Sequence, residues 1–448
     1  MRGRIIVVSN RLPLNIVEKD GQLVADRSIG GLATALSAVF SRYEPLWVGW
    51  TGLRKVLPAE VLQNLDLPKS VVPVQLPKRL VEYFYDTVSN RAIWPVLHGL
   101  EPAIHITDAD WDGYLQATKR FATTIRQLIQ PDDVLWLHDL HLLMLPAALR
   151  ELGVENKIGF FLHSPFPPED YFLRLPQASQ FLSSLCQVDV LGLQTAPDAD
   201  AFWETLKTAR LMDQPGLVRV IPIGIDYLQY QAAAARSDVQ KRLAHIKAAQ
   251  TAPRNILSIS RLDYTKGIIQ QLRAVERFLQ QQPEPQQFSY TLVVAPSRET
   301  VPEYRQLKRE IAREVTRINK HLARPGWLPV DYHYENIPFV EVTAQYLAAD
   351  VLLLAPIADG MNLIAKEFVA TKAADGMLVI SRTMGAAYQL REAVQVDPTD
   401  VQSIADGLQQ AFTLAPSECR ARAEQLRAGV QAQDVFWWAE RFMRALEA

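Results

Sequence analysis

The sequence predicts an α/β protein built from two doubly wound, Rossmann-like domains. Short apolar runs recur along the chain, and segments of helical length separate them. The runs are brief and rich in β-branched residues, which favours buried parallel strands over helices. Because strands and helices alternate over the whole chain, we expect parallel sheets with helices on both faces. The predicted strands are Ile5–Val8, Val134–Leu137, Ile158–Leu162, Val188–Gly192, Val218–Ile223, Ile256–Ile259, Tyr290–Val294, Val351–Leu354 and Met377–Ile380.

The length of 448 residues favours two domains. A boundary is expected after Asp226, because the next stretch to Pro253 is rich in Ala, Gln and Lys and contains no apolar run. A new series of strands then begins at Ile256. We therefore predict two Rossmann-like domains, one over residues 1–226 and the other over residues 227–435. The apolar helix over residues 436–448 is expected to return to the first domain.

Composition excludes several classes of protein. Hydrophobic residues make up 48% of the chain and the net charge is −2, so nucleic acid is not expected as the main partner. No apolar stretch approaches the ~18 residues of a membrane span, and the N-terminus lacks the apolar region of a signal peptide. The cysteines, Cys186 and Cys419, are far apart in sequence and form neither a metal-binding motif nor a disulfide framework, which favours two structural thiols in a reducing compartment. We expect a cytoplasmic protein with no membrane partner.

Familiar cofactor motifs are missing. No GxGxxG follows the first strand of either half, which disfavours a nicotinamide dehydrogenase, and no GxxxxGK[ST] occurs, which disfavours a P-loop kinase. His138 and His141 are close enough to suggest a metal site, but no third ligand has a suitable spacing. Neither a metal nor another cofactor is expected.

The strongest functional signal is a pair of cations, Arg261 and Lys266, in the stretch SRLDYTKG between a strand and a helix. Backbone N–H groups, the helix dipole and side-chain cations converge on one anion at such a turn. The segment Asp359–Glu367 repeats the arrangement at another strand end. Glu367 lies about two helical turns after Asp359, where a carboxylate suits the hydroxyls of a ribose. Alone, each cation could equally be a solvated surface charge; together the two turns predict a diphosphate leaving group held from two sides.

The first half carries a second cluster, suited to a phosphorylated sugar. Arg11 follows the first strand, and Gly30 and Gly31 can present backbone N–H groups closely to a ligand. Asp139 and His163 each follow an apolar strand. Tyr85 and Trp94 flank a turn-rich stretch, although core packing is the simpler explanation for Trp94 alone. We expect the strand ends of both halves to face a ligand cleft between the domains.

With these residues in place, the chain closely resembles retaining glycosyltransferases of the trehalose-6-phosphate synthase family, which have the GT-B fold. The resemblance runs from about residue 4 to residue 440 and covers both halves in order. The stretches that carry it are VVSNRLP (7–13), GGL (30–32), WVGWTG (47–52), WPVLH (94–98), WDGY (111–114), LHDLHLLMLP (137–146), IGFFLHSPFPP (158–168), VLGLQT (190–195), IPIGID (221–226), SRLDYTKG (260–267), APSR (295–298), ADGMNLIAKEFVA (358–370) and MGAA (384–387).

The resemblance implies an enzyme that transfers glucose from UDP-glucose to glucose 6-phosphate, forming α,α-trehalose 6-phosphate and UDP. It implies a catalytic set of Arg261, Lys266, His163 and Asp359, with His163 beside the C6 hydroxyl of the donor glucose. The implied donor site consists of Gly31, Arg261, Lys266, Asp359, Gly360, Met361, Asn362, Leu363 and Glu367. The implied acceptor site consists of Arg11, Tyr85, Trp94 and Arg298 around the 6-phosphate, and of Trp47 and Asp139 around the sugar.

The sequence also fits the mechanism that the resemblance implies. No pair of carboxylates stands out as the nucleophile and acid of a glycosidase. Members of the family are thought to use front-face attack, in which the leaving phosphate accepts the proton of the acceptor. The protein then supplies positioning and charge stabilisation.

Some positions depart from the family pattern, and some alternatives stay open. Leu140 replaces an aromatic residue, Gln389 replaces a carboxylate, and Asn336–Phe339, expected near the donor base, differs between branches of the family. A glucosylglycerol-phosphate synthase, a pseudo-glycosyltransferase and an inert sugar-phosphate-binding regulator are the alternatives. The motifs leave open the donor nucleotide (UDP, ADP or GDP), and they are compatible with a homo-oligomer. A separate trehalose-phosphate phosphatase is expected to act on the product.

Overall fold

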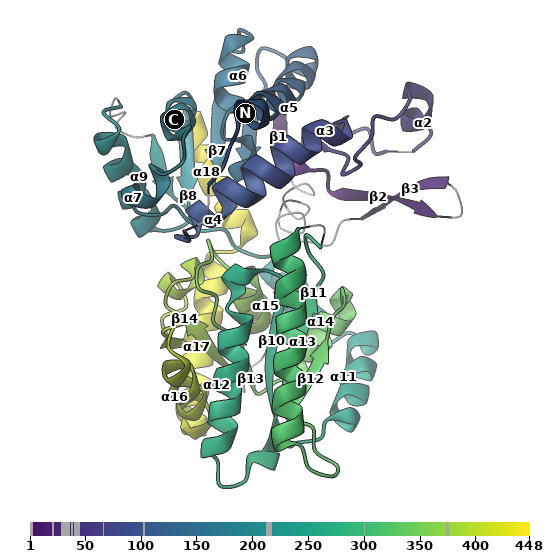
Figure 1. Ribbon diagram of the computed structural model, residues 1–448, viewed down its shortest axis with the longest axis vertical. Helices are drawn as coiled ribbons and strands as arrows, with labels where there is room; N and C mark the ends of the chain where they lie inside the picture. Colours follow the sequence, from purple (N-terminus) through teal and green to yellow (C-terminus); the bar gives the residue numbers. More distant parts are fainter. Residues whose placement is uncertain are drawn as a thin grey trace. The chain divides into compact units, whose positions relative to one another are not determined.

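The computed structural model divides the chain into two compact units (Figure 1). It describes residues 3–19, 22–27, 36, 39, 45–65, 67–101, 104–211, 217–299, 301–372 and 376–448. The first unit contains Met1–Ile223 and Val435–Ala448, and the second contains Gly224–Asp434. The chain therefore passes between the units twice, at Gly224 and at Asp434. These two connections lie side by side, since a Cβ on Gly224 would be 2.3 Å from the backbone of Asp434. The predicted boundary at residue 226 lies just after the first connection.

The first unit is built on a parallel sheet of seven strands in the order β5-β4-β1-β6-β7-β8-β9. The chain moves from β1 to one edge through β4 and β5, and then returns to β6 on the other side of β1. A separate antiparallel hairpin follows β1. The strands are β1 (Ile5–Arg11), β2 (Leu14–Lys19), β3 (Gln22–Arg27), β4 (Leu46–Trp50), β5 (Val71–Val74), β6 (Val134–His138), β7 (Ile158–Phe161), β8 (Val190–Leu193) and β9 (Val218–Val220).

Helices of the first unit include one unusual element, the π-helix η1 (Glu82–Ile93), which contains Tyr85 and leads directly to Trp94. π-Helical turns occur frequently at functional sites. The other helices are α2 (Ala59–Gln63), α3 (Lys78–Val81), α4 (Trp94–Leu97), α5 (Asp108–Leu128), η2 (Leu140–Leu142), α6 (Leu145–Glu151), α7 (Glu169–Phe172), α8 (Ala178–Leu185), α9 (Ala196–Thr208) and α18 (Val435–Glu447).

The last helix, α18, belongs to the first unit, as Figure 1 shows in yellow. Trp438 and Phe442 are fully buried, and their rings lie 4.8 and 5.1 Å from the ring of Trp136. Glycines on the neighbouring strands make room for this helix, because a Cβ on Gly159 or on Gly192 would come within 2.5 or 2.8 Å of the ring of Phe442. The apolar face of the terminal segment is therefore part of the first core.

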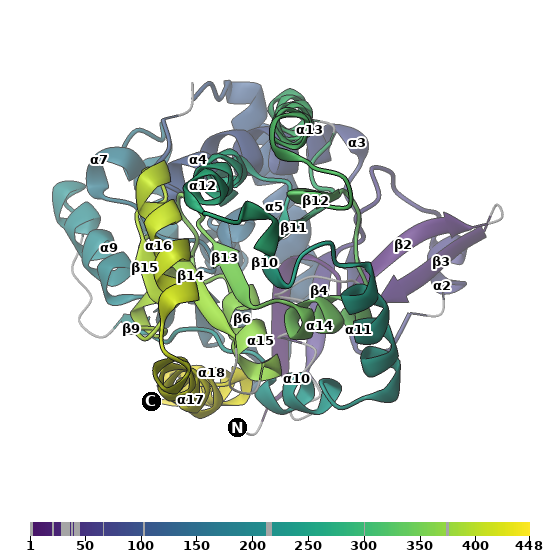
Figure 2. The same ribbon diagram turned by 90° about the horizontal axis from the view of Figure 1, so that it is seen from below.

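The second unit has a parallel sheet of six strands in the order β12-β11-β10-β13-β14-β15. Helices cover both faces, with α12, α13 and α16 on one face and α11, α14 and α15 on the other (Figure 2). The strands are β10 (Arg254–Arg261), β11 (Phe288–Ala295), β12 (Val330–His333), β13 (Val351–Leu354), β14 (Met377–Ser381) and β15 (Val394–Val396). The helices are α10 (Tyr227–Ala233), α11 (Ser237–Ala249), η3 (Tyr264–Lys266), α12 (Ile268–Gln281), η4 (Pro285–Gln287), α13 (Pro302–Leu322), α14 (Phe339–Ala348), α15 (Leu363–Thr371), η5 (Gly385–Tyr388), α16 (Val401–Thr413) and α17 (Pro416–Ala432).

Each predicted strand overlaps a strand of the structure, so the predicted α/β class is confirmed. The missed strands of the two sheets include the edge strands β5, β12 and β15. Edge strands bury less of their surface and need no continuous apolar run, and β5 also contains Pro73, which a central strand would not tolerate. None of the helices among the described residues has the length and apolar composition needed to cross a membrane.

A close backbone contact holds the turn that follows β13. The N–H of Gly385 donates to the carbonyl of Asp359 at 3.0 Å, and the N–H of Ala386 donates to the carbonyl of Met361 at 2.9 Å. A Cβ on Gly385 would lie only 1.8 Å from the carbonyl oxygen of Gly360. Only glycine therefore allows η5 to approach this turn so closely.

We predict opposite effects of two glycine substitutions on stability. Gly385→Ala forces the backbone of η5 away from Gly360, and we expect it to lower the free energy of unfolding by about 1–3 kcal/mol. Gly429→Ala is the matched control, because its Cβ meets nothing within 4 Å on α17. It should stabilise the helix by roughly 0.5–1 kcal/mol. Denaturant unfolding of both variants checks this, and equal stabilities would contradict the close contact.

Candidate functional site

The candidate site of the second unit lies at the point where the order of its strands reverses. The chain continues from β10 to β11 on one side and from β13 to β14 on the other, although β10 and β13 are neighbours. In open α/β sheets, ligands bind at the carboxyl ends of the strands at such a switch point. The N–H of Ile357 donates to the carbonyl of Thr265 at 2.7 Å, so the turns that follow the two strands are joined.

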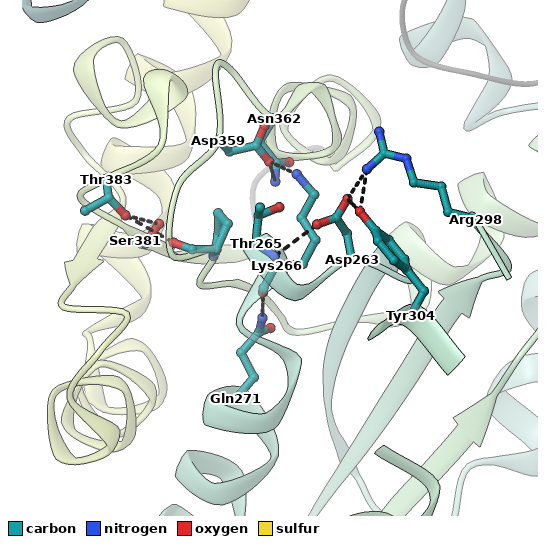
Figure 3. A network of polar contacts seen from close by, with 11 residues as sticks. Asp263, Thr265, Lys266, Gln271, Arg298, Tyr304, Asp359, Asn362, Ser381 and Thr383 are labelled. Carbon is teal, nitrogen blue, oxygen red and sulfur yellow. Dashed lines mark hydrogen bonds and ion pairs between the residues drawn. The ribbon is translucent and has the colours of Figure 1, made fainter. Parts of the chain in front are cut away.

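One ion pair joins the two predicted phosphate turns. Nζ of Lys266 lies 2.7 Å from Oδ2 of Asp359, and the side chains are 10% and 15% exposed. The side-chain amide of Asn362 donates to the same oxygen at 3.0 Å (Figure 3). Asn362 has a φ of 69° directly before α15, a left-handed conformation that Asn tolerates better than most residues. The structure thus brings Lys266, Asp359 and Asn362 together.

Gly267 allows the lysine turn to pack in this way. Its φ of 63° is left-handed, and a Cβ would lie 2.4 Å from the carbonyl oxygen of Ala355. The side-chain amide of Gln271 then donates to the carbonyl of Lys266 at 2.7 Å, which fixes the start of α12. The position of the ammonium group is consequently set by backbone geometry as well as by its carboxylate partner.

A buried carboxylate that the sequence analysis overlooked, Asp263, organises the other side of the turn. Its Oδ2 accepts hydrogen bonds from Arg298 at 3.0 Å and from the hydroxyl of Tyr304 at 3.2 Å, and its Oδ1 accepts from the N–H of Thr265 at 3.0 Å. Figure 3 shows Asp263 between Tyr304 and Lys266, with Arg298 reaching it from the far side. Burial raises the pKa of Asp263, but the cations of Arg298, Lys266 and Arg261 outweigh it and hold that pKa below its usual value.

The pairing of Asp263 also places Arg298, predicted as an acceptor ligand, in the same network as Lys266. The side chain of Arg298 is only 7% exposed, and the residue has a left-handed φ of 47°. The sequence does contain a signal for Asp263, because this carboxylate lies between the two predicted phosphate-binding cations of SRLDYTKG. The sequence alone does not reveal its partners, because Arg298 and Tyr304 are distant along the chain.

Arg261 and Glu367 complete the predicted donor residues of this unit. Arg261 ends β10 and is exposed to solvent. Glu367 lies on α15, where the hydroxyl of Tyr346 donates to its Oε2 at 2.8 Å. Burial raises the pKa of Glu367, while hydrogen bonds from Tyr346 and Tyr230 oppose the rise. The two tyrosines were not predicted, since neither stands near the motif in sequence.

The first unit has its own switch point, between β1 and β6. Arg11 ends β1, and its guanidinium lies 4.9 Å from the ring centroid of Trp50. The ring of Trp50 is 5.6 Å from that of Tyr85, which stacks on His141 at 5.6 Å. The structure thus brings Arg11 and Tyr85 into one cluster and adds Trp50, a residue that the sequence analysis did not select.

Asp139 and His163 are brought together at the ends of β6 and β7. Oδ1 of Asp139 accepts hydrogen bonds from the N–H of His163 at 3.3 Å and from the hydroxyl of Ser164 at 3.2 Å. Asp139 has a φ of 72°, and strained conformations of this kind are concentrated at functional sites. Burial lowers the pKa of His163 to about 4, so the imidazole is neutral near pH 7.

Three other predicted site residues have less direct support from the geometry. Trp47 is 2% exposed, and its Nε1 donates to the hydroxyl of Ser9 at 2.7 Å. Trp94 is buried and packs on His98 with ring centroids 4.0 Å apart. Gly31 lies outside the described residues. Their roles stay predictions.

The positions that depart from the family pattern are accommodated locally. Leu140 is fully buried, as an apolar core residue is. The side-chain amide of Gln389 donates to that of Gln433. Over the part of the chain that the structure describes, no three His, Cys, Asp or Glu side chains gather as a metal site would require.

Comparisons with known proteins place the chain in one family. The model of glycosyltransferase family 20 matches residues 3–448. The chain is 34% identical to a bifunctional trehalose-6-phosphate synthase/phosphatase of Thermoproteus tenax and 33% identical to a UDP-forming α,α-trehalose-phosphate synthase of Dictyostelium discoideum. Each alignment covers 99% of this chain, but the chain spans only 63% and 62% of those relatives. It spans 95% of a trehalose-6-phosphate synthase of Enterobacter sp., with 33% identity over 99% of this chain.

Solved structures show the same likeness over the full length. A UDP-forming α,α-trehalose-phosphate synthase of Burkholderia xenovorans, in complex with glucose 6-phosphate, superimposes with a TM-score of 0.90 at 30% identity and covers 100% of both chains. An E. coli structure bound with UDP-2-fluoro glucose has a TM-score of 0.89 at 31% identity and covers 99% of both chains. The predicted GT-B class, with two Rossmann-like domains, is confirmed by this likeness. The chain belongs to glycosyltransferase family 20.

Proposed function

We propose that the chain is a UDP-forming trehalose-phosphate synthase, which transfers glucose from UDP-glucose to glucose 6-phosphate with retention of configuration. The observation that carries the proposal is the Lys266–Asp359 pair at the switch point of the second sheet. It sets an anion-binding cation beside a hydroxyl-binding carboxylate, as a nucleotide sugar requires. Membership of family 20 and relatives solved with glucose 6-phosphate and with UDP-2-fluoro glucose support the choice of substrates.

On the donor side, the ion pair leaves hydrogen-bond donors of Lys266 for a ligand. An ammonium group has three N–H donors, and Asp359 uses one of them in this structure. We assign the other donors of Lys266, together with Arg261, to the diphosphate. The backbone amides of Gly360 to Leu363 enter α15, where the helix dipole also favours an anion. Asp359 and Glu367 then bind the hydroxyls of glucose and of ribose.

On the acceptor side, we assign Arg11, Tyr85, Trp94 and Arg298 to the 6-phosphate, and Trp47 and Asp139 to the sugar. Trp50 joins this set because it lies between Arg11 and Tyr85. Arg11 fits an anion site, since a guanidinium offers several donors in a plane and Trp50 supports one of its faces. Gly31 is assigned to the donor phosphate by the resemblance alone.

The proposed chemistry requires positioning and charge stabilisation. As the bond to glucose breaks, negative charge grows on the departing phosphate, and Lys266 and Arg261 stabilise it. The hydroxyl of glucose 6-phosphate attacks the anomeric carbon on the face from which the phosphate leaves, and an oxygen of that phosphate accepts the proton of the hydroxyl. The protein therefore needs neither a nucleophile nor a general base of its own. The neutral imidazole of His163 can bind a sugar hydroxyl without adding charge. The free thiols Cys186 and Cys419 fit our proposal of a cytoplasmic enzyme.

The direct test is UDP release from UDP-glucose, measured with and without glucose 6-phosphate and followed by identification of the product. We expect release to depend on glucose 6-phosphate and the product to be α,α-trehalose 6-phosphate. Release only with glycerol 3-phosphate would replace the proposal with a sister activity, and no release with any acceptor would favour a binding protein. The same assay with ADP-glucose and GDP-glucose defines the donor nucleotide.

The proposed diphosphate clamp consists of Arg261 and Lys266, and it predicts large losses of kcat in two variants. Arg261→Ala and Lys266→Ala each remove a cation that stabilises the leaving group, which typically raises a barrier by about 3–4 kcal/mol. Steady-state kinetics with saturating substrates measure the effect. Arg254→Ala is a matched control, because Arg254 begins the same strand at its opposite end. Near-normal turnover in both clamp variants would remove the clamp from the mechanism.

The assignment of Arg298 needs a test that separates binding from folding. Arg298→Ala should raise the KM for glucose 6-phosphate at least tenfold and change the KM for UDP-glucose far less. It also leaves the carboxylate of Asp263 buried without its arginine partner, which we expect to cost about 3–5 kcal/mol of stability. Adding Asp263→Asn should restore much of the stability without restoring the affinity for the acceptor. Recovery of that affinity in the double variant would reduce Arg298 to a structural role.

The stability loss in Arg298→Ala should also depend on pH. Arg298 lowers the pKa of Asp263 in the folded protein, so its contribution is present above the ordinary pKa of a carboxyl, about 4. It is lost as the pH falls through the lowered folded value, because a protonated Asp263 no longer needs a cation. Unfolding measured at pH 7 and in acid should therefore show a larger difference between wild type and variant at pH 7.

A further inference from the structure

Two histidines of the first unit are hydrogen-bonded ring to ring. His138 is the last residue of β6, and His163 follows the neighbouring strand β7. Nδ1 of His138 lies 3.0 Å from Nε2 of His163. Asp139, the next residue, accepts the backbone N–H of His163 at 3.3 Å. Two consecutive residues thus hold the backbone and the ring of His163.

Aromatic side chains enclose this pair. The ring of His138 lies 4.7 Å from that of Trp136 and 6.2 Å from that of Trp438. The ring of His163 lies 4.7 Å from that of Phe161 and 6.0 Å from that of Trp438. Trp438 comes from α18, so the terminal helix helps to enclose both histidines. Burial lowers the pKa of both rings, and both are neutral near pH 7.

The surroundings of His138 indicate which nitrogen of each neutral ring carries its proton. Nε2 of His138 is buried and has no hydrogen-bond partner in the described part of the chain. A buried N–H without a partner is rarer than a buried acceptor without one, so the proton of His138 belongs on Nδ1. It is then donated to Nε2 of His163. His163 must therefore carry its own proton on Nδ1, which no described residue binds.

We propose that His138 is a positioning residue that holds His163 in the Nδ1–H tautomer and directs this N–H toward a hydroxyl oxygen of the donor sugar. The inference rests on the proposed function, in which His163 contacts the glucose of UDP-glucose. It assigns a separate task to each ring: His163 touches the substrate, and His138 fixes the direction of the hydrogen bond. A neutral donor at this position discriminates by geometry and adds no charge to the site.

Two substitutions separate the hydrogen bond from the volume of the side chain. His138→Phe fills the space among the aromatic rings but cannot donate to His163. Loss of a residue that orients a metal-bound histidine typically costs about 10–100-fold in activity, and we expect a fall of similar size in kcat here. The KM for glucose 6-phosphate should stay within about twofold. His138→Asn can donate from its side-chain amide and should recover at least part of kcat.

The tautomer is read directly by nitrogen NMR of the protein labelled with ¹⁵N-histidine, without substrates. In the wild type we expect the signals of His163 to show a protonated Nδ1 and a bare Nε2. In His138→Phe, Nε2 of His163 loses its hydrogen-bond donor, so we expect the Nε2–H tautomer, which a neutral imidazole ordinarily prefers, to become populated. Phe442→Leu is the matched control, because Phe442 packs on Trp136 and Phe161 from α18. It should lower stability without changing the tautomer of His163.

The two readouts keep this inference distinct from the proposed function. A wild-type His163 that carries its proton on Nε2 would overturn the inference, whatever the activity. So would a His138→Phe variant with full kcat, or a His138→Asn variant as impaired as His138→Phe. Absence of glucosyl transfer in the wild type would instead contradict the proposed function, while the NMR spectrum would still report the tautomer.

Discussion

The structure of the candidate site depends on the ion pair between Lys266 and Asp359. Each residue stands on a turn at the end of a different strand, and the pair joins the turns at the switch point of the second sheet. An unpaired ammonium group in this partly buried position would be costly, and so would an unpaired carboxylate. Pairing holds both in place before a ligand arrives. We propose that the ligand then recruits the remaining donors of one and the remaining lone pairs of the other.

Much of the surrounding structure supports this pair. Gly267 and Gly385 permit backbone approaches that a side chain would block, and Asn362 adds a second hydrogen bond to Asp359. On the other side of the turn, Asp263 neutralises Arg298 and brings another cation beside the lysine turn. In the first unit a carboxylate also holds a neighbouring turn at the switch point: Asp139, which has a strained conformation, accepts a hydrogen bond from the backbone N–H of His163. In both units the candidate site residues lie at the carboxyl ends of strands, and the packing of the sheets holds those ends in place.

The sequence predicts the buried strands and the residues at their ends, because both leave local signals. An apolar run such as Val351–Leu354 identifies a central strand, and the motif that follows it identifies Asp359. Edge strands such as β15 (VQV) escape prediction because they have no continuous apolar run, and β5 (VVPV) escapes it because Pro73 interrupts its valines. Asp263, Trp50 and Tyr346 also escape it, since their importance comes from partners far away in the chain. Local pattern therefore predicts the ligand-binding turns, while the partners that orient them require the fold.

The most direct test of the account is the affinity of Asp359→Asn for UDP, measured by calorimetry alongside its turnover of UDP-glucose. If Lys266 binds the diphosphate and Asp359 binds the sugar, the asparagine variant loses turnover and keeps its affinity for UDP. We expect that affinity to equal or exceed the wild-type value, because the lysine no longer has a charged partner in the protein. A fall in UDP affinity parallel to the loss of turnover would contradict the division of roles on which the account rests.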